Sequence, residues 1–235
     1  MQVSTKEEGK HLRTSIFVAL MLSFFMVVSY TLQQFFDDGF CPGIQPGNTD
    51  GLYGLLLYPF FHSSISHLLS NLPPLFFLSA GTFYYLPKKL FPALLTIWLA
   101  SAIVIWTFGR SGCHLGASGL VYGLAFMLAT LGFLKKQRTL GSFALIIVFM
   151  YGSMIWGVLP QEGNVSWEGH AGGAATGILL ALFWRNLRIY GHKDETEIED
   201  DDDDDFDFRG YGDELNSTTS GSPINYHFTP EDDKD

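Results

Sequence analysis

The stretch Gly116-Ala117-Ser118-Gly119-Leu120-Val121-Tyr122-Gly123 opens an apolar run that continues to Leu134. Its serine stands at the start of a segment apolar enough to be a membrane helix, where a polar side chain is unusual and marks a candidate functional site. A second run of small residues, Gly169-His170-Ala171-Gly172-Gly173, opens another apolar segment and carries a histidine. We expect Ser118 and His170 to meet in the folded chain.

The distribution of charge indicates the fold class. The chain has 235 residues, of which 47% are hydrophobic and 15% aromatic, and these values suit either a large soluble core or a membrane protein. Between Gly51 and Gln161, however, there is no Asp or Glu. A soluble domain would not leave so long a stretch without acidic residues, so we predict an all-α, multi-pass membrane protein.

Six apolar runs have about the length of a membrane span. A helix needs about 20 residues to cross the roughly 30 Å of hydrocarbon in a bilayer. The runs are Ile16–Leu32, Ser64–Leu86, Pro92–Phe108, Ala117–Leu134, Leu140–Leu159 and Ala171–Trp184. The runs that open on Ala117 and Ala171 are shorter, so we expect these helices to start below the membrane surface with their first turns facing a cavity.

The two ends of the chain differ in charge from the predicted membrane domain, residues 14–190. Residues 1–13 form a short basic cytoplasmic leader, and Gln33-Gln34-Phe35-Phe36 offers no small-residue cleavage pattern, so we expect the first run to be a retained anchor. The net charge of −10 belongs to the C-terminal end, because residues 194–235 carry 17 of the 24 acidic residues. Residues 191–235 are therefore expected to form a disordered, acidic, cytoplasmic tail.

Basic residues predict how the spans are oriented, because Lys and Arg gather in short loops on the cytoplasmic side of membrane proteins. If six spans alternate, only Arg110 falls on one side, and the other side holds Lys6, Lys10, Arg13, Lys88, Lys89, Lys135, Lys136, Arg138, Arg185, Arg188 and Lys193. Both termini are then cytoplasmic, and segments 33–63, 109–116 and 160–169 lie outside. We expect a protein of the plasma (cytoplasmic) membrane with its polar site toward the outer side.

The first outer segment is expected to be structured. Residues 33–61 are rich in aromatic residues, Gly and Pro, which predicts a lobe lying partly in the membrane interface. Cys41 and Cys113 both fall on the outer side, where oxidation is possible. Their spacing does not decide whether they pair, and we expect two free thiols in preference to a disulfide.

The second span carries two further polar residues. His67 and Asn71 are four residues apart and therefore share one helical face. Pro73-Pro74 follows within a turn of Asn71 and removes two backbone donors, which should kink or loosen this helix.

Ser118 and His170 are predicted to lie at one depth. Ser118 is 17 residues before the basic residue that follows its run, roughly 25 Å along a helix, and His170 is 15 residues before its own, roughly 22 Å. Small residues at Gly119-x-x-x-Gly123 and Gly173-x-x-x-Gly177 would let the two backbones approach closely. The alternative is that these glycines have a structural role in helix packing alone.

The residue types at this level suit nucleophilic catalysis. No carboxylate lies within any predicted span, so a nucleophilic Ser118 would have only His170 as its base, in a dyad. His67 and Asn71 could then donate hydrogen bonds to an oxyanion, beside the backbone N–H of Ser118. Each residue also has a structural interpretation, because a membrane serine commonly bonds its own helix backbone and a histidine can simply bridge two helices.

These motifs resemble those of the rhomboid intramembrane serine proteases. The matches are Gly116-Ala117-Ser118-Gly119 for the family's Gly-x-Ser-Gly, His67-x-x-x-Asn71 on the second span, His170 followed by Gly173 and Gly177 on the sixth, Tyr122 for the tyrosine that stacks on the catalytic histidine, and His62 for another recurrent histidine. The resemblance covers about residues 14–190. Two features depart from it: Tyr53-Gly54 replaces the Trp-Arg pair usual in the first outer loop, and Pro73-Pro74 is unusual after the asparagine.

The resemblance implies a bundle of six transmembrane helices, N-in and C-in, with an interfacial first outer loop. Ser118 and His170 would be catalytic, and the site would be supported by His67, Asn71, Gly116 and Tyr122. Such an enzyme hydrolyses a peptide bond in or near the transmembrane segment of another membrane protein, which enters between the second and fifth spans. The expected partners are single-span membrane proteins and the lipid bilayer, with no nucleic acid, no cofactor and no metal.

Two other interpretations are open. The protein could keep the fold but only bind transmembrane helices, in which case its activity would survive loss of Ser118. It could instead bind a metal or haem, because His62, His67, His114 and His170 all lie toward the outer face and imidazoles bind zinc and iron. A chelator would then abolish its function, whereas a serine dyad would be insensitive.

Overall fold

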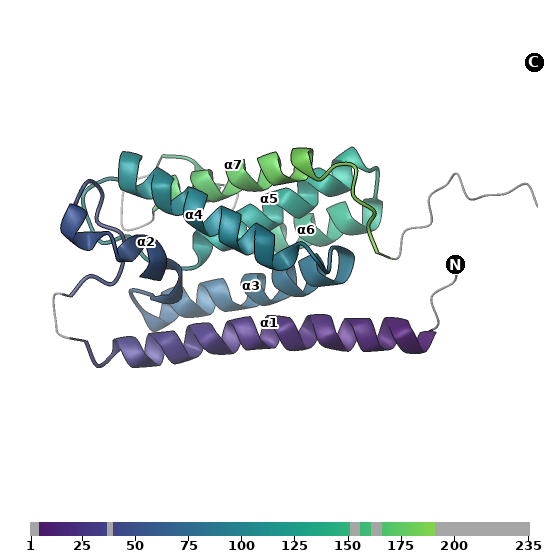
Figure 1. Cartoon of the computed structure of the whole chain (residues 1–235), viewed down its shortest axis with the longest axis horizontal. Helices are drawn as coiled ribbons and strands as arrows, with labels where there is room; N and C mark the ends of the chain where they lie inside the picture. Colours follow the sequence, from purple (N-terminus) through teal and green to yellow (C-terminus); the bar gives the residue numbers. More distant parts are fainter. Residues whose placement is uncertain (1–4, 37–39, 151–155, 161–165, 191–235) are drawn as a thin grey trace, which may run out of the picture. The chain divides into compact units, whose positions relative to one another are not determined.

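The structure is a computed structural model that describes residues 5–36, 40–150, 156–160 and 166–190 (Figure 1). All of these belong to one compact unit, Met1–His192. The second unit, Lys193–Asp235, lies outside the described residues, and with it the predicted acidic tail.

The described residues form helices and no strand. The long helices are α1 (Thr5–Gln33), α3 (Ile65–Tyr85), α4 (Leu90–Phe108), α5 (Ser118–Leu134), α6 (Arg138–Met150) and α7 (Trp167–Phe183), and the short ones are η1 (Thr49–Gly51), α2 (Gly54–Leu57), η2 (Tyr58–Phe60) and η3 (Trp156–Val158). One isolated antiparallel bridge joins Ile44 and His114. The all-α prediction is confirmed for this part of the chain.

The start of α1 differs from the prediction. The helix begins at Thr5, so most of the predicted basic leader is helical and continuous with the first apolar run. His11 explains this extension, because its ring packs on the rings of Tyr84 and Tyr190 and its Nε2 lies 3.0 Å from the carbonyl oxygen of Tyr84. The basic charges of the leader do not stop a helix that has such a partner.

One other predicted helix limit is changed, whereas the predicted effect of the prolines stays a prediction. α3 runs through Pro73 and Pro74 as one helix, and Pro74 is buried. α6 ends at Met150, before the predicted limit at Leu159. Residues 151–155 lie outside the described part, and the chain then forms the single turn η3.

α5 is the central helix of this unit. It contacts α3, α4, α6 and α7, whereas α1 lies at the edge and packs mainly on α3 (Figure 1). The α5 side chains of Leu124, Met127, Leu128 and Leu131 are fully buried. Because α5 is enclosed on all sides, the residue at its first turn is held by several helices at once.

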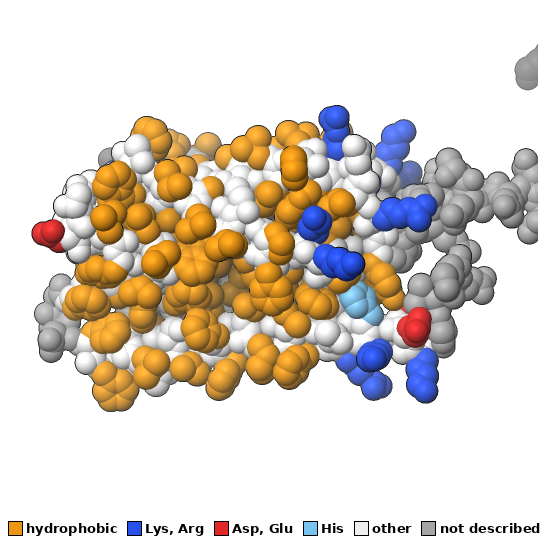
Figure 2. Space-filling view, in the orientation of Figure 1, with side chains coloured by type: hydrophobic (Ala, Val, Ile, Leu, Met, Phe, Trp, Pro, Cys, Tyr) orange, Lys and Arg blue, Asp and Glu red, His pale blue; other side chains and the backbone are white. Residues whose placement is uncertain are grey.

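The flank of the unit is apolar. Figure 2 shows hydrophobic side chains covering the visible flank, with the basic side chains gathered at one end. Two described helices, Lys6–Gln33 and Leu90–Phe108, are long and apolar enough to cross a membrane, and Ser118–Leu134 and Arg138–Phe149 are apolar but shorter. This surface suits hydrocarbon contact along the flank and water at the basic end.

The basic end is where several helix termini meet. The backbone N–H of Tyr190, after α7, donates to the carbonyl of Tyr85 at the end of α3 (3.0 Å). Lys89, just before α4, lies 5.2 Å over the ring of Trp184, which ends α7. The residues expected on one side of the membrane therefore share one end of the bundle.

Candidate active site

α5 and α7 approach each other through glycines. A Cβ added to Gly173 would collide with the carbonyl oxygen of Gly119, and one added to Gly177 with that of Gly123. The predicted contact between the two small-residue motifs is confirmed. The two backbones touch, so polar side chains in their first turns can reach each other.

Ser118 and His170 meet at this junction. Ser118 is the first residue of α5, and His170 lies in the first turn of α7. The Oγ of Ser118 lies 2.7 Å from Nε2 of His170, which is 7% exposed. The predicted hydrogen bond between these two residues is present.

The other ring nitrogen of His170 decides which way this bond points. Nδ1 lies 2.9 Å from the carbonyl oxygen of Gly157 in η3. A carbonyl can only accept, so Nδ1 carries the proton; in a neutral ring Nε2 is then the acceptor, and the hydroxyl of Ser118 donates to it. Gly157 was not predictable from the sequence, because a backbone carbonyl has no side-chain signature.

Tyr122 holds the face of the same ring. Its side chain stacks on His170 with ring centroids 4.1 Å apart and planes 12° from parallel. Tyr122 lies one turn after Ser118 on α5, so serine and stacking ring come from one rigid helix. The stacking that the resemblance implied is confirmed.

Gly116 brings His67 to the site. Its φ of +120° is a conformation that other residues rarely adopt, and a Cβ there would lie 2.6 Å from Cε1 of His67. The backbone N–H of Gly116 donates to the carbonyl of Tyr58 (2.8 Å), which fixes the turn that precedes Ser118. The imidazole of His67 therefore lies directly beside this turn, and its Nδ1 is 3.1 Å from Oγ of Ser63.

Asn71 bonds its own helix. Its side-chain Nδ2 donates to the carbonyl of His67 in α3 (2.8 Å), and the residue is 5% exposed. The amide carries a second N–H, so donation by Asn71 to an oxyanion stays a prediction. Asn71 supports the backbone that carries His67.

His62 supports the same turn, and its ring centroid lies 5.1 Å from that of His67. It precedes α3, is fully buried, and accepts the backbone N–H of Ala117 through Nε2 (3.4 Å). Burial, together with the neighbouring His67, lowers the pKa of His62 to about 3. His62 is therefore neutral at physiological pH, as an accepting nitrogen requires.

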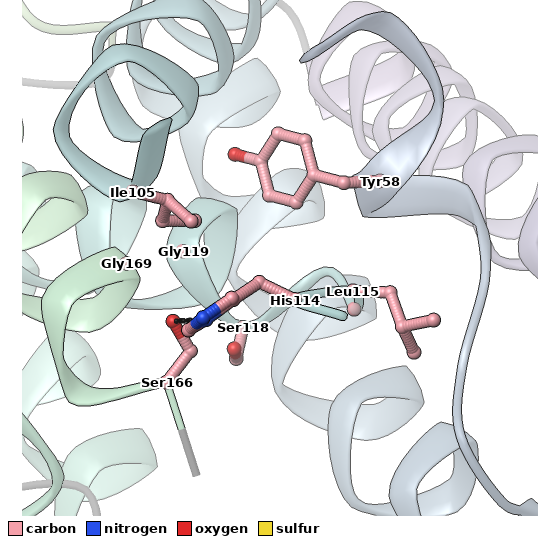
Figure 3. Close-up of a pocket in the computed structure, with 9 residues that line it drawn as sticks. Tyr58, Ile105, His114, Leu115, Ser118, Gly119, Ser166 and Gly169 are labelled. Carbon is pink, nitrogen blue, oxygen red and sulfur yellow. Dashed lines mark hydrogen bonds between the residues drawn. The ribbon is translucent and has the colours of Figure 1, made fainter. Parts of the chain in front are cut away.

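A small pocket lies beside Ser118 (Figure 3). Its lining residues are Tyr58, Ile105, His114, Leu115, Gly116, Ser118, Gly119, Ser166 and Gly169. The volume open to the centre of a water molecule in this pocket is about 10 Å³. This is about the volume that one buried water needs. The pocket therefore offers a polar space for water next to the serine hydroxyl.

Cys41 and Cys113 form a disulfide, so the expectation of two free thiols was wrong. The backbone explains the pairing: Ile44 and His114 exchange N–H···O bonds of 2.7 and 2.9 Å, which align the outer lobe with the loop before Ser118. The Cα atoms of the two cysteines are consequently 5.8 Å apart. A sequence separation of 72 residues hid this proximity.

The histidines do not gather as a metal-binding set within the described ranges, where no three His, Cys, Asp or Glu side chains are grouped to hold an ion. His114 has both ring nitrogens engaged, Nδ1 with Ser166 Oγ at 2.8 Å and Nε2 with the carbonyl of Arg110 at 2.7 Å. His170 is likewise engaged at both nitrogens.

Comparison with known proteins adds a family. Residues 49–186 match the family model described as the Rhomboid domain. An uncharacterized protein of Mycobacterium tuberculosis strain H37Rv is 35% identical over 149 residues, which cover 59% of this chain and 62% of the relative. An uncharacterized protein of Mycobacterium leprae strain TN is 30% identical over 149 residues, 59% of each chain. The chain thus spans about three fifths of the length of the curated relatives it matches.

Proposed function

This chain belongs to the rhomboid family of membrane-embedded proteins, and from that premise we propose that it is a serine endopeptidase that cleaves transmembrane segments of other membrane proteins. One observation carries the proposal. The hydroxyl of Ser118 donates to Nε2 of a His170 ring whose tautomer is fixed by the Gly157 carbonyl. The carbonyl takes the orienting part that a carboxylate has in a Ser-His-Asp triad.

In the proposed reaction, Ser118 Oγ attacks the carbonyl carbon of the scissile peptide while its proton passes to Nε2 of His170. His170 then gives this proton to the departing amine, and an ester of Ser118 is left. A water molecule adds to the ester, His170 takes the water's proton, and the proton returns to Ser118 as the ester bond breaks. The pocket beside Ser118 has room for such a water.

Negative charge develops on the substrate oxygen during both steps. The first N–H groups of α5 have no partner inside the helix, so the N–H of Ser118 is available as a donor. The ring of His67, next to Gly116, is the nearest side-chain candidate for a second donor. One of the two N–H groups of the Asn71 carboxamide is taken by the carbonyl of His67, so we assign this residue mainly to the support of α3.

The proposal includes a membrane arrangement. Six spans place both termini in the cytoplasm and the Ser118 site toward the outer side of the plasma membrane, and the substrate, a single-span membrane protein, enters between α3 and α6. The apolar flank and the basic end support this arrangement. Reporter fusions after Leu32, Leu86, Phe108 and Leu134 should alternate between outside and inside.

Co-expression with a panel of single-span membrane proteins tests the function. The wild type should cleave at least one of them, and Ser118→Ala should not. A serine-directed phosphonate should label the wild type and fail to label Ser118→Ala. Association with a substrate but no cleavage or labelling would instead support a catalytically silent binder of transmembrane helices.

A further inference from the structure

The loop between α4 and α5 is tied to the start of α7 by two side-chain pairs. The first is ionic: Nε of Arg110 and the backbone N–H of Arg110 both donate to Oε1 of Glu168, at 2.8 and 3.3 Å. The side chain of Glu168 is 1% exposed and that of Arg110 is 41% exposed. A carboxylate so buried is retained only where it has charged or hydrogen-bonding partners.

The second pair joins His114 and Ser166 (Figure 3). The carbonyl of Arg110 accepts from Nε2 of His114 at 2.7 Å, so Nδ1 is the accepting nitrogen and Ser166 donates its hydroxyl to it at 2.8 Å. The two pairs are thus connected through the backbone of Arg110. Four side chains form this set, Arg110, Glu168, His114 and Ser166, and we call it the loop clamp.

Ser166 gives up a local interaction to join the clamp. It stands at the N-cap position of α7 but makes no side-chain cap hydrogen bond. Serine is among the best N-cap residues, and leaving the cap bond unmade weakens the start of a helix. A residue that leaves a favourable local role for a contact across the fold indicates that the contact has its own importance.

The clamp acts on the residues that carry the proposed chemistry. Glu168 and His170 are two residues apart in the first turn of α7, and the N–H of His170 bonds the carbonyl of Ser166 (3.3 Å). First turns of helices have few internal bonds and are the part most able to fray. The glycine contacts at Gly173 and Gly177 fix α7 only farther along.

We propose that the loop clamp positions His170, holding its ring at hydrogen-bond distance from Ser118. The clamp joins the loop that leads into Ser118 to the helical turn that carries His170, so it sets the separation of the two reacting groups from the outer side. The proposal rests on the proposed function for its catalytic meaning. The hydrogen bond itself can be measured whether or not the protein cleaves a substrate.

Glu168 is ionised at neutral pH, so its ion pair with Arg110 is present under physiological conditions. Glu168 precedes the predicted span that begins at Ala171. Burial by itself raises the pKa of this carboxyl, but the hydrogen bonds and charge of Arg110 outweigh burial and hold the pKa below its usual value. The pair is therefore ionised at neutral pH and above, and is lost only when the pH falls through the lowered pKa.

The test compares Glu168→Ala, which removes the acceptor, with Glu168→Gln, which keeps an oxygen at the position of Oε1. Glu7→Ala, at an exposed carboxylate of α1, is the matched control for a lost charge. The ¹⁵N chemical shift of His170 Nε2 reports the bond from Ser118, with Ser118→Ala as the reference for the unbonded nitrogen. Glu168→Ala should move the shift toward that reference, and Glu168→Gln and Glu7→Ala should leave it near the wild type.

Kinetics supply the second readout. A displacement of about 1 Å at a reacting group can reduce the rate about 10²-fold, so kcat and phosphonate labelling should fall by about that factor in Glu168→Ala. KM should be unchanged because the substituted residue, Glu168, does not line the pocket beside Ser118, and Glu168→Gln should recover most of the rate. If Glu168→Ala does not fold, Ser166→Ala takes its place with the same readouts and a smaller loss.

The outcomes separate the two proposals. A wild-type ¹⁵N shift in both Glu168→Ala and Ser166→Ala would overturn the clamp, and so would an equal defect in Glu168→Ala and Glu168→Gln. A wild type that neither cleaves nor labels, while its shift still responds to Glu168→Ala, would overturn the proposed function and keep the clamp.

Discussion

Of the three serine–histidine pairs in the described residues, Ser118–His170 and Ser166–His114 share one geometry, and Ser63–His67 is the third. In each of the first two pairs one ring nitrogen donates to a backbone carbonyl and the other accepts from the serine hydroxyl. The nitrogen–oxygen distances to serine are 2.7 and 2.8 Å. In hydrogen-bond geometry, the two imidazoles are therefore nearly equivalent.

Their surroundings differ. Ser118 is flanked by Gly116 and by the ring of His67, which can donate a hydrogen bond, and its partner histidine is stacked on Tyr122. Ser166 lies two residues before the carboxylate of Glu168. A negative charge near a serine opposes the oxyanion that acyl transfer requires, whereas a donor stabilises it. A serine–histidine hydrogen bond thus provides a base, and the neighbouring charges determine whether a nucleophile can use it.

The largest expected difference between the pairs is in cleavage after loss of the serine. Ser118→Ala should reduce the rate by on the order of 10⁴-fold or more, His170→Ala should do the same, and the double mutant should be no worse, because nucleophile and base act as one unit. Ser166→Ala, which removes one bond of the loop clamp, should lose less than about 10²-fold. Both effects are measured on one substrate with purified protein, and protease inhibitors of other classes exclude contaminants.

The opposite pattern would reverse the comparison. If Ser166→Ala abolished cleavage and phosphonate labelling while Ser118→Ala retained both, the second pair would be the catalytic one and the assignment of Ser118 would be wrong.

The next effect concerns the donor beside Ser118. His67→Ala should lower kcat by about 10²–10³-fold, the usual loss for one oxyanion donor. Asn71→Ala should lose less, because its amide bonds the carbonyl of His67 and acts on the site only through α3. Single-turnover labelling by the phosphonate separates this effect from substrate binding. Equal and full activity in both variants would remove α3 from the site.

The sequence predicted the parts of this site that depend on periodic patterns. The apolar runs predicted the bounds of α3, α4 and α5 to within a few residues. The spacing of glycines on two helices predicted the contact that brings Ser118 to His170. The extension of α1 was not predictable from its own residues, because it depends on the packing of His11 against distant rings. A periodic apolar pattern shows that a segment can form a helix. Packing against distant residues depends on the whole fold and leaves no such pattern.

The missed residues share a physical reason. Gly157 contributes only its carbonyl, the disulfide joins residues 72 apart, and Glu168 lies just outside the predicted span, in the first turn of α7. None of these leaves a local pattern in the chain. The orientation of Asn71 was equally hidden, because a helical asparagine can bond its own backbone or reach across, and only the packed neighbours decide.

A smaller effect is expected from the carbonyl that orients His170. A Cβ added to Gly157 would collide with the hydroxyl of Tyr122 and lie 3.1 Å from Nδ1 of His170. The ring must then shift, so Gly157→Ala should reduce kcat by about 10²-fold. Adding Tyr122→Phe removes the colliding hydroxyl and should restore part of the rate. Gly141→Ala, whose Cβ would meet nothing closer than 3.8 Å, is the control.

A Gly157→Ala variant with unchanged kcat would show that the position of this carbonyl does not limit His170. A loss that Tyr122→Phe does not relieve would assign the effect to the backbone of η3 and not to the ring stack.

The smallest effect on activity should come from loss of the disulfide between Cys41 and Cys113, which lies next to His114 of the second pair. Cys113→Ser leaves the backbone bonds between Ile44 and His114 and the bond from Gly116 to Tyr58 in place, so the turn before Ser118 keeps its supports. Cleavage should stay within a few-fold of the wild type, while the free energy of unfolding falls by about 2–4 kcal/mol, a typical loss for one disulfide. Cys41→Ser should have the same effects as Cys113→Ser, and the double mutant should be no worse, because either change removes the same bond.

Thermal unfolding and phosphonate labelling, each with and without a thiol reductant, measure stability and activity on one sample. If reduction abolished labelling at a temperature where the protein stays folded, the position of Ser118 would depend on the outer lobe, and the two serine–histidine pairs would be coupled through the loop that this disulfide anchors.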